Sequence, residues 1–236
     1  GETSVFKETD NVIISGKINN YENKIGQNTI LISRRDFFES MIRKSTSINS
    51  DGTFKLSFNT TYHEQIYVNY GGLFSVYCSP GDSIHIEIDM DFFYSGNEEL
   101  IKFSDNKEGK MNTLLTRFFK EKPEEKYVSR YTAGPVAEST PDEFKKYVYD
   151  REKDYRTYMN KFIEKNKPSE LFIKWVDDHF KYETWQDLMR YCWHKPYLEN
   201  IKRDEFELPD DFHSFLSDYD MNDRGLFTMN HFGFLH

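Results

Sequence analysis

Alanine, cysteine and long apolar runs are scarce in this sequence. Alanine occurs only twice among 236 residues, as Ala133 and Ala137. The core must therefore be built from aromatic and β-branched side chains, and large rings bury enough area each to make this feasible. Because no stretch approaches about 18 consecutive apolar residues, the sequence predicts no transmembrane helix.

Basic side chains are outnumbered by acidic ones. Lys and Arg total 31 and Asp and Glu total 40, so the formal net charge is −9. Nucleic acids and anionic membranes attract basic surfaces, so neither is expected to be the main partner. The net charge is modest for this length, and aromatic residues reach 17%. We therefore expect a folded chain rather than a disordered one.

The two cysteines, Cys78 and Cys192, are far apart in the sequence. Without a C-x-x-C motif there is no thioredoxin-type redox pair, and two thiols cannot complete a four-cysteine zinc site. We expect two separate buried thiols, since free cysteine is among the most buried residue types. A single disulfide between them is the alternative.

The first 104 residues follow a period of two. Ile84, Ile86 and Ile88 alternate with His85 and Glu87, and such alternation is typical of an antiparallel sheet with one face on the core. Turn signals rich in Gly, Asn and Pro separate the apolar runs. The predicted strands lie near 11–18, 28–34, 41–48, 53–59, 65–70, 73–78, 83–89 and 100–104. Short strands at this spacing predict an antiparallel β-sandwich or open barrel.

The remaining residues follow a helical period and are more highly charged. Thr140-Pro141-Asp142-Glu143 combines an N-cap, a proline in the first turn and a capping-box glutamate. The predicted helices cover 107–121, 141–165, 169 to Pro196 (which should end that helix), 209–219 and a last piece from Asp223, with an exposed loop at 122–139. We therefore expect an α+β fold with a β-sandwich domain at 1–104 and a helical domain or connector at 105–236.

Three short motifs in the strand region carry a family resemblance: ISGKI at 14–18, DGTF at 51–54 and SPGDSI at 79–84. In this order they resemble the N-terminal β-domain of envelope-anchored, thioredoxin-like thiol-disulfide oxidoreductases of Gram-negative bacteria. The helical half is also similar to the connecting helices of that family, at 162–163, 168–169 and 208–216. In the family, a thioredoxin domain with the C-x-x-C follows these helices.

The resemblance implies a non-catalytic region located in the periplasm or cell envelope. The full-length protein would be lipid-anchored, and it would meet the membrane only through an N-terminal anchor absent from this chain. The chain stops at His236, where the family's thioredoxin domain would begin, so no catalytic residue can be carried over. The implied role is to position that missing redox domain or to contact clients or a partner subunit, including a second copy in a homodimer.

Neither a catalytic centre nor a metal or cofactor site is predicted. Cys192 and His194 are two positions apart, so on a helix they point about 200° apart and cannot easily chelate one ion. The acidic residues Asp89, Asp91 and Glu98–Glu99 lack the pattern of a calcium loop, and solvated turn charge is the simpler interpretation. Phosphate-loop and nucleophile-elbow motifs are missing, so a stand-alone enzyme is the weakest hypothesis.

The candidate binding residues are four aromatic side chains, Trp185, Tyr191, Trp193 and Tyr197. They cannot all face one core from a single helix, so some rings should be exposed. Exposed aromatic rings often border contact surfaces for proteins or carbohydrates. An aromatic core, required by the shortage of small residues, is the competing interpretation. The alternative function is accordingly a stand-alone envelope binding module for glycan or peptide.

Overall fold

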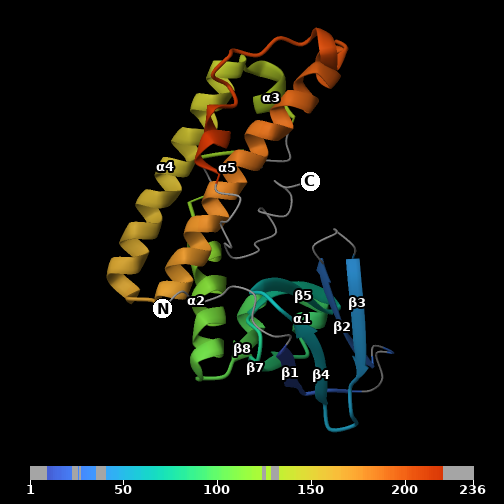
Figure 1. Ribbon diagram of the computed structural model, residues 1–236. Helices are drawn as coiled ribbons and strands as arrows, with labels where there is room; N and C mark the ends of the chain where they lie inside the picture. Colours follow the sequence, from blue (N-terminus) through green and yellow to red (C-terminus); the bar gives the residue numbers. More distant parts are fainter. Residues whose placement is uncertain are drawn as a thin grey trace. The chain divides into compact units, whose positions relative to one another are not determined.

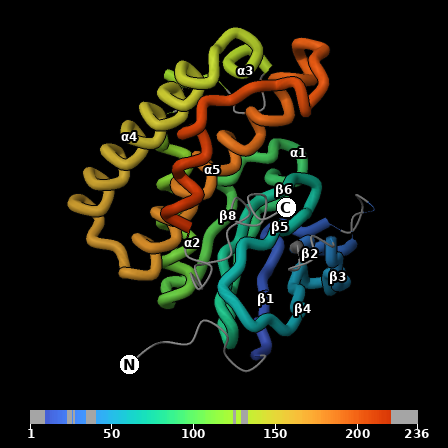
Figure 2. The backbone as a smooth tube through the Cα atoms, turned by 45° about the horizontal axis from the view of Figure 1, so that its top comes forward, coloured from blue at the N-terminus to red at the C-terminus, as the bar shows by residue number. Residues whose placement is uncertain are grey.

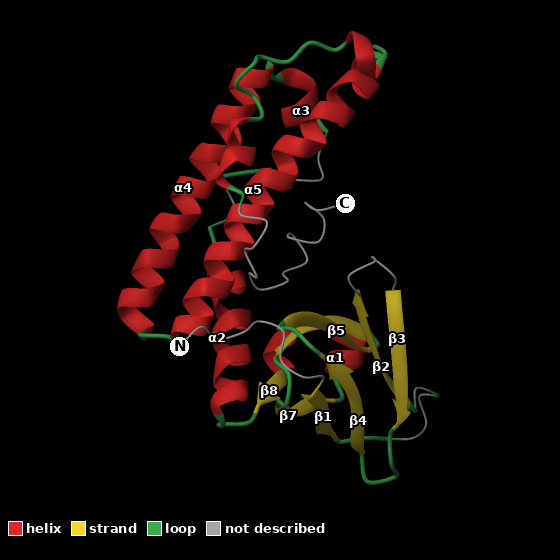
Figure 3. Cartoon of the chain, viewed as in Figure 1, coloured by secondary structure: helices red, strands yellow, loops and turns green. Residues whose placement is uncertain are grey.

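The computed structural model describes residues 10–22, 26, 28–35, 41–123, 126–128 and 133–219. It confirms an α+β fold in which strands come first and long helices follow (Figure 3). Contacts divide the chain into two compact units, 1–120 and 121–236. The sequence placed the division after residue 104, whereas the structure counts nearly all of helix α2 (Lys107–Glu121) with the strands.

The first unit contains two four-stranded sheets, with strand orders β4-β1-β7-β8 and β3-β2-β5-β6 (Figure 1). The strands are β1 (Asp10–Asn19), β2 (Thr29–Arg35), β3 (Met41–Ser47), β4 (Thr53–Thr60), β5 (Glu64–Tyr70), β6 (Gly72–Cys78), β7 (Ser83–Asp89) and β8 (Ile101–Phe103). All eight coincide with predicted strands. A one-turn helix α1 (Phe92–Ser95) and a 3₁₀ turn η2 (Glu98–Leu100) connect β7 to β8 and were not predicted.

Residues that alternate between apolar and polar in the sequence lie on opposite faces of the sheet. On β7, Ile84, Ile86 and Ile88 are fully buried, whereas His85 and Glu87 between them are exposed. One pairing differs from the antiparallel prediction, because β1 and β7 run parallel. Alternation reports which face is buried but carries no strand direction, so only long-range pairing could decide this point.

Two of the short motifs meet across the pair of strands β1 and β4. Gly16 lies directly opposite Phe54 in the antiparallel register. A Cβ atom at position 16 would lie 2.1 Å from the carbonyl oxygen of Ile86 and 2.4 Å from the Phe54 ring. Position 16 therefore requires glycine, because the ring occupies the space that a side chain would need.

The edge strands β3 and β4 of the two sheets are joined through side chains. Lys44 on β3 donates to the backbone carbonyl of Ser57, and the Thr46 hydroxyl donates to the carbonyl of Lys55 at 2.9 Å. These bonds occupy backbone acceptors that an unprotected edge would offer to another chain.

The second unit is built on a pair of long helices, α4 (Pro141–Asn166) and α5 (Glu170–Glu199), which pack alongside each other (Figure 2). The predicted capping box of α4 is present, with Thr140 and Glu143 bonded reciprocally. Lys167 in the left-handed conformation ends α4, and the Ser169 side chain caps α5. Both helix starts therefore follow from local capping chemistry.

Three predictions in the helical half need correction. The region 122–139, expected to be an exposed loop, contains helix α3 (Gly134–Glu138), where Val136 is fully buried. The expected helix at 209–219 is a turn followed by the 3₁₀ helix η4 (Ser214–Asp218). Phe212 and Phe215 both enter one core cluster, and their spacing of three suits a 3₁₀ turn. The piece expected from Asp223 onward lies outside the described residues.

The third correction concerns Pro196, which does not end α5. Proline removes one amide donor from the helix, but here the helix continues to Glu199. Asn200 ends it in the left-handed conformation, and its amide donates to the carbonyls of Pro196 and Tyr197. Tyr197 is therefore held on the last turn of the helix rather than in a loop.

Charged side chains are buried between α4 and α5. A guanidinium nitrogen of Arg151 lies 2.5 Å from an oxygen of Asp187, and both side chains are almost fully buried. Arg190 approaches the other oxygen of Asp187 at 3.5 Å. Burial lowers the pKa of Arg151, but the neighbouring Asp187 and Glu183 more than offset this and raise it. Arg151 is therefore charged in the folded protein.

Candidate functional site

The structure does not bring the four candidate aromatic residues together. Trp185 and Tyr191 belong to the core of the second unit. The Tyr191 hydroxyl donates to the carbonyl of Ser139 at 2.8 Å, and its ring stacks on Phe144 at 4.7 Å. Trp193 and Tyr197 are instead 50% and 79% exposed. These two rings form the exposed part of the predicted patch, whereas the other two are core residues.

Helix geometry separates the two pairs. Successive residues turn by about 100°, so Trp193 and Tyr197, four apart, lie about 40° from each other on one side of α5. Arg190 and His194 fall on the same side by the same spacing. Tyr191 lies on the core side, and so does Lys195, which donates to the carbonyl of Ala137 at 2.7 Å.

The exposed side of α5 carries a shallow hollow of about 380 Å³, lined by Arg190, Trp193, His194 and Tyr197. Its lining is almost entirely apolar, and it is open along much of its surface. The His194 ring stacks on Tyr197 with centroids 6.5 Å apart. The hollow therefore presents flat ring faces and offers few polar groups.

Arg203 covers part of this side. It lies beyond the end of α5, in the 3₁₀ turn η3 (Arg203–Glu205), and its guanidinium carbon sits 5.1 Å from the centre of the Trp193 ring. A guanidinium over an indole face is attracted by the ring quadrupole. We call Arg190, Trp193, His194, Tyr197 and Arg203 together the α5 surface.

Sequence reasoning missed three members of the α5 surface. Arg190 and His194 could have been found, because with Trp193 and Tyr197 they form the i, i+3, i+4, i+7 spacing of one helix face. Arg203 could not, because it follows the end of the helix and its place over Trp193 depends on how the chain turns after Asn200.

The two thiols are separate, as predicted, with one in each unit. Cys78 is fully buried on β6, and burial raises the pKa of its thiol well above the ordinary value. Cys192 is only partly buried, contrary to expectation; burial raises its pKa too, and its sulfur lies 3.4 Å from Nε2 of His213. Both groups are therefore protonated thiols at neutral pH, whereas the form that attacks disulfides is the thiolate.

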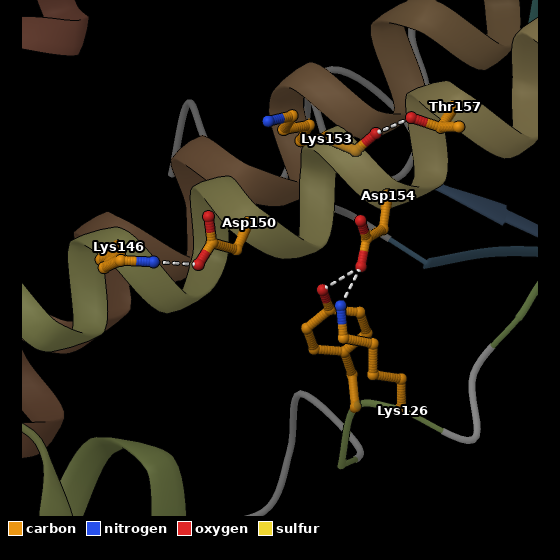
Figure 4. A network of polar contacts seen from close by, with 7 residues as sticks. Lys126, Lys146, Asp150, Lys153, Asp154 and Thr157 are labelled. Atoms are coloured by element: carbon orange, nitrogen blue, oxygen red, sulfur yellow. Dashed lines mark hydrogen bonds and ion pairs between the residues drawn. The ribbon is translucent and has the colours of Figure 1, made fainter.

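A polar network on α4 holds the segment 126–128 (Figure 4). The Lys126 ammonium and the Tyr127 hydroxyl both donate to one oxygen of Asp154, the latter at 2.6 Å. The bond from Lys126 lowers the pKa of Asp154, whereas burial raises the pKa of Tyr127. At neutral pH the carboxylate is charged and the phenol is not, so neither is poised for proton transfer. The network attaches a connecting segment to the helix.

A serine–histidine contact in the first unit also has a structural role. Nδ1 of His63 lies 2.7 Å from the Ser79 hydroxyl. The carboxylate nearby, Asp82, accepts the Ser79 amide at 2.7 Å. The contacts of Ser79 with Asp82 and His63 fix the turn between β6 and β7.

Two of the four acidic residues considered for calcium make other contacts. Asp89 accepts the Asp91 amide at 3.0 Å, which closes a turn, and Glu99 pairs with Lys120. Within the described residues, no group of three or more His, Cys, Asp or Glu side chains is arranged to hold a metal ion. In the same part of the chain, no helix combines the length and apolar character needed to span a membrane.

Comparisons of the chain with protein-family models, with curated proteins and with solved structures find no match. The features of this chain that bear on its function are the α5 surface, the two protonated thiols and the motifs at 14–18, 51–54 and 79–84.

Proposed function

We propose that this chain is a non-catalytic region of a cell-envelope thiol-disulfide oxidoreductase, which contacts a protein partner or client and positions a redox domain. The observation that carries the proposal is the α5 surface, where Trp193 and Tyr197 are exposed beside Arg190 and Arg203. Tryptophan, tyrosine and arginine are the residues most enriched at the energetic centres of protein interfaces.

The non-catalytic part of the proposal is supported by the two thiols. A reductase needs a low-pKa thiolate close to a second cysteine. Here both pKa values are raised by burial, and the cysteines belong to different units. Neither thiol has the electronic environment or the partner that disulfide exchange requires.

The link to an oxidoreductase is supported by the resemblance of the strand motifs and connecting helices to that family. A periplasmic or envelope location and a lipid anchor outside this chain belong to the same proposal. The complete reading frame tests it directly, because the proposal requires a C-x-x-C within roughly one further domain, about 100 residues, after His236. A stop codon soon after His236 would favour a stand-alone binding module instead.

Activity measurements test the division of roles. The chain alone should reduce insulin in dithiothreitol only at the uncatalysed rate. The full-length protein should reduce disulfides. Trp193→Ala should slow its reaction with a protein disulfide more than its reaction with a small aromatic disulfide, because only a protein substrate is large enough to contact the α5 surface while its disulfide is at the redox domain. Turnover by the chain alone that disappears in Cys192→Ser would contradict the proposal.

The stand-alone binding module is favoured by one observation, the exposure of Trp193 and Tyr197 in a hollow. Of the two ligands considered for such a module, peptide suits the surface better than glycan. A sugar can lay a C–H face on an aromatic ring, but its hydroxyl groups also need polar partners, whereas the exposed lining of the hollow is almost entirely apolar.

A further inference from the structure

We infer that the α5 surface binds a partner-protein segment that places an apolar side chain against Trp193 and Tyr197 and a carboxylate against Arg203. This inference rests on the proposed function, since it assumes that the surface contacts a protein. It adds the chemistry by which that protein is recognised.

The shape of the hollow selects the size of the occupant. Pockets for small molecules enclose most of the ligand surface, but this hollow is shallow and its described lining comes from one helix. A small ligand would remain largely in water. A side chain projecting from a protein surface would fill the hollow while the surrounding surface of the partner covered the exposed rings, as at the centre of a protein interface.

The charge on Arg203 selects the chemistry of the occupant. Three other basic side chains at this end of α5 each have a carboxylate within ion-pair distance. These pairs are Arg190–Asp187 at 3.5 Å, Lys195–Glu199 at 2.9 Å and Lys202–Glu205 at 3.2 Å. Within the described part of the chain, Arg203 has no such carboxylate, and its guanidinium instead lies over Trp193.

The contact with Trp193 is compatible with binding an acid. The guanidinium carbon lies over the Trp193 ring, and the N–H donors of a guanidinium lie in its plane and point outward along its edge. A carboxylate can accept two of these donors side by side, which is the strongest and most directional arrangement for an arginine. An aspartate or glutamate next to the inserted apolar residue would therefore reach Arg203.

A second copy of the chain is a poorer occupant. In a two-fold contact the same surface must fit itself. Two shallow hollows placed face to face enclose a void, and atoms lining a void lose their packing contacts. The α5 surface calls for a partner that protrudes, which makes self-association an alternative outcome of the test rather than the expected one.

The probe for the test is a displayed library of random peptides, selected on the intact chain. Selected peptides should combine a large apolar residue with a nearby Asp or Glu. Their affinity should fall about tenfold or more in Trp193→Ala, Tyr197→Ala and Arg203→Glu, as expected for central interface residues. Tyr94→Ala is the matched control, because the exposure of Tyr94, 65%, lies between those of Trp193 and Tyr197 but the residue is on α1; it should leave binding unchanged.

Exchanging the charges of the peptide and of Arg203 gives the most specific test. Replacing the acidic residue of a selected peptide with Lys should abolish binding to the wild-type chain and restore it to Arg203→Glu. Trp193→Phe, which keeps a ring, should retain most of the binding. All variants change exposed side chains, and matching thermal melts would show that each is folded.

Three results would overturn the inference. The first is peptides that bind the Tyr197→Ala variant as well as the wild type. The second is binding that is indifferent to Arg203→Glu. The third is a dimer, seen by sedimentation, that Trp193→Ala dissociates, which would assign the surface to a second copy. Failure of the proposed function is distinguishable: acid-dependent peptide binding without any effect of Trp193→Ala on full-length disulfide exchange would reject the function and leave the inference standing.

Discussion

The two units differ in the residue types that fill their cores. In the sheet unit the core is made of isoleucine, valine, leucine and aromatic side chains, and Glu64 is the one charged residue buried among the described residues. In the helical unit several charged residues are buried along with the rings. They are Arg151, Asp178, Glu183, Asp187 and Lys195.

The difference follows from geometry. A strand with period two sends alternate residues to opposite faces, so polar side chains can be kept out of the core without interrupting the apolar ones. Helix α5 is buried on more than one side along much of its 30 residues, and a helix buried on several sides has little exposed surface for its polar residues. The charges inside must then pair, as Arg151 and Asp187 do.

The largest expected effects test the rule of the sheet unit. Phe54→Ala should destabilise by about 3–5 kcal/mol and Ile86→Ala by about 2–5 kcal/mol, because both side chains are buried in the core. Lys55→Ala and Glu87→Ala change the neighbouring exposed residues and should stay within about 0.5 kcal/mol. Urea melts measure all four. Equal losses for Lys55→Ala and Phe54→Ala would remove the distinction between the two faces.

A comparable loss tests the rule of the helical unit. Asp187→Ala leaves Arg151 buried with Glu183, 3.9 Å away, as its remaining carboxylate, so we expect destabilisation by about 3 kcal/mol, the lower end of the range for a broken buried pair. Asp150→Ala breaks an exposed ion pair with Lys146, four residues earlier on α4, and should lower the free energy of unfolding by about 0.5 kcal/mol or less. The double variant Arg151→Met/Asp187→Leu should recover part of the stability, because it removes the Arg151–Asp187 pair but also takes Arg151 from Glu183 and Asp187 from Arg190. No recovery at all would contradict mutual neutralisation as the role of the pair.

A smaller effect concerns the start of α4. Thr140→Ala removes the cap and should cost about 1 kcal/mol. The amide and hydroxyl of Thr140 also lower the pKa of Glu143 below its ordinary value of 4.5. A carboxyl group whose pKa is lower in the folded state than in the unfolded state stabilises the fold at pH values above its unfolded-state pKa. This stabilisation is lost as the pH falls through the folded-state pKa. Thr140→Ala removes the part of this effect that comes from the hydroxyl and keeps the part from the amide, so its cost should shrink somewhat at acidic pH. Thermal melts at neutral and acidic pH would show whether it does.

The smallest expected effect separates two tyrosines on one helix. Tyr197→Ala should change stability by about 0.5 kcal/mol or less, because the ring is exposed. Tyr191→Ala is the matched change on the core side and should cost several times more, since it empties a fully buried site that includes a hydrogen bond to Ser139. Similar melts for the two variants would contradict the division of α5 into a core side and an exposed side.

Much of the secondary structure could be predicted because its causes are local. The bounds of α2 agree with the prediction, and α4 begins where its capping box does. The predicted helix end at Pro196 is wrong, because a proline removes only one amide donor and the helix continues until Asn200, four residues later, ends it. Helix α3 was missed because the Pro- and Gly-containing sequence around it is also typical of loops.

The candidate site could be predicted only in part. The sequence indicated that some of the four rings on this helix must be exposed, and Trp193 and Tyr197 are. It could not distinguish Tyr191 from Tyr197, because that depends on which side of α5 the neighbouring elements cover. Nor could it place Arg203 over Trp193, since the contact forms only after the chain has turned beyond the helix.

The sequence by itself determined the order of strands and helices, the buried face of most strands and the absence of a C-x-x-C, because periodicity, capping and motif spacing are properties of neighbouring residues. Only the tertiary structure decided that β1 and β7 run parallel, that Arg151 meets Asp187, and that Trp193 and Tyr197 lie open beside Arg203. Each of these is a contact or an exposure set by residues from other segments of the chain, and no local pattern specifies which segments will meet.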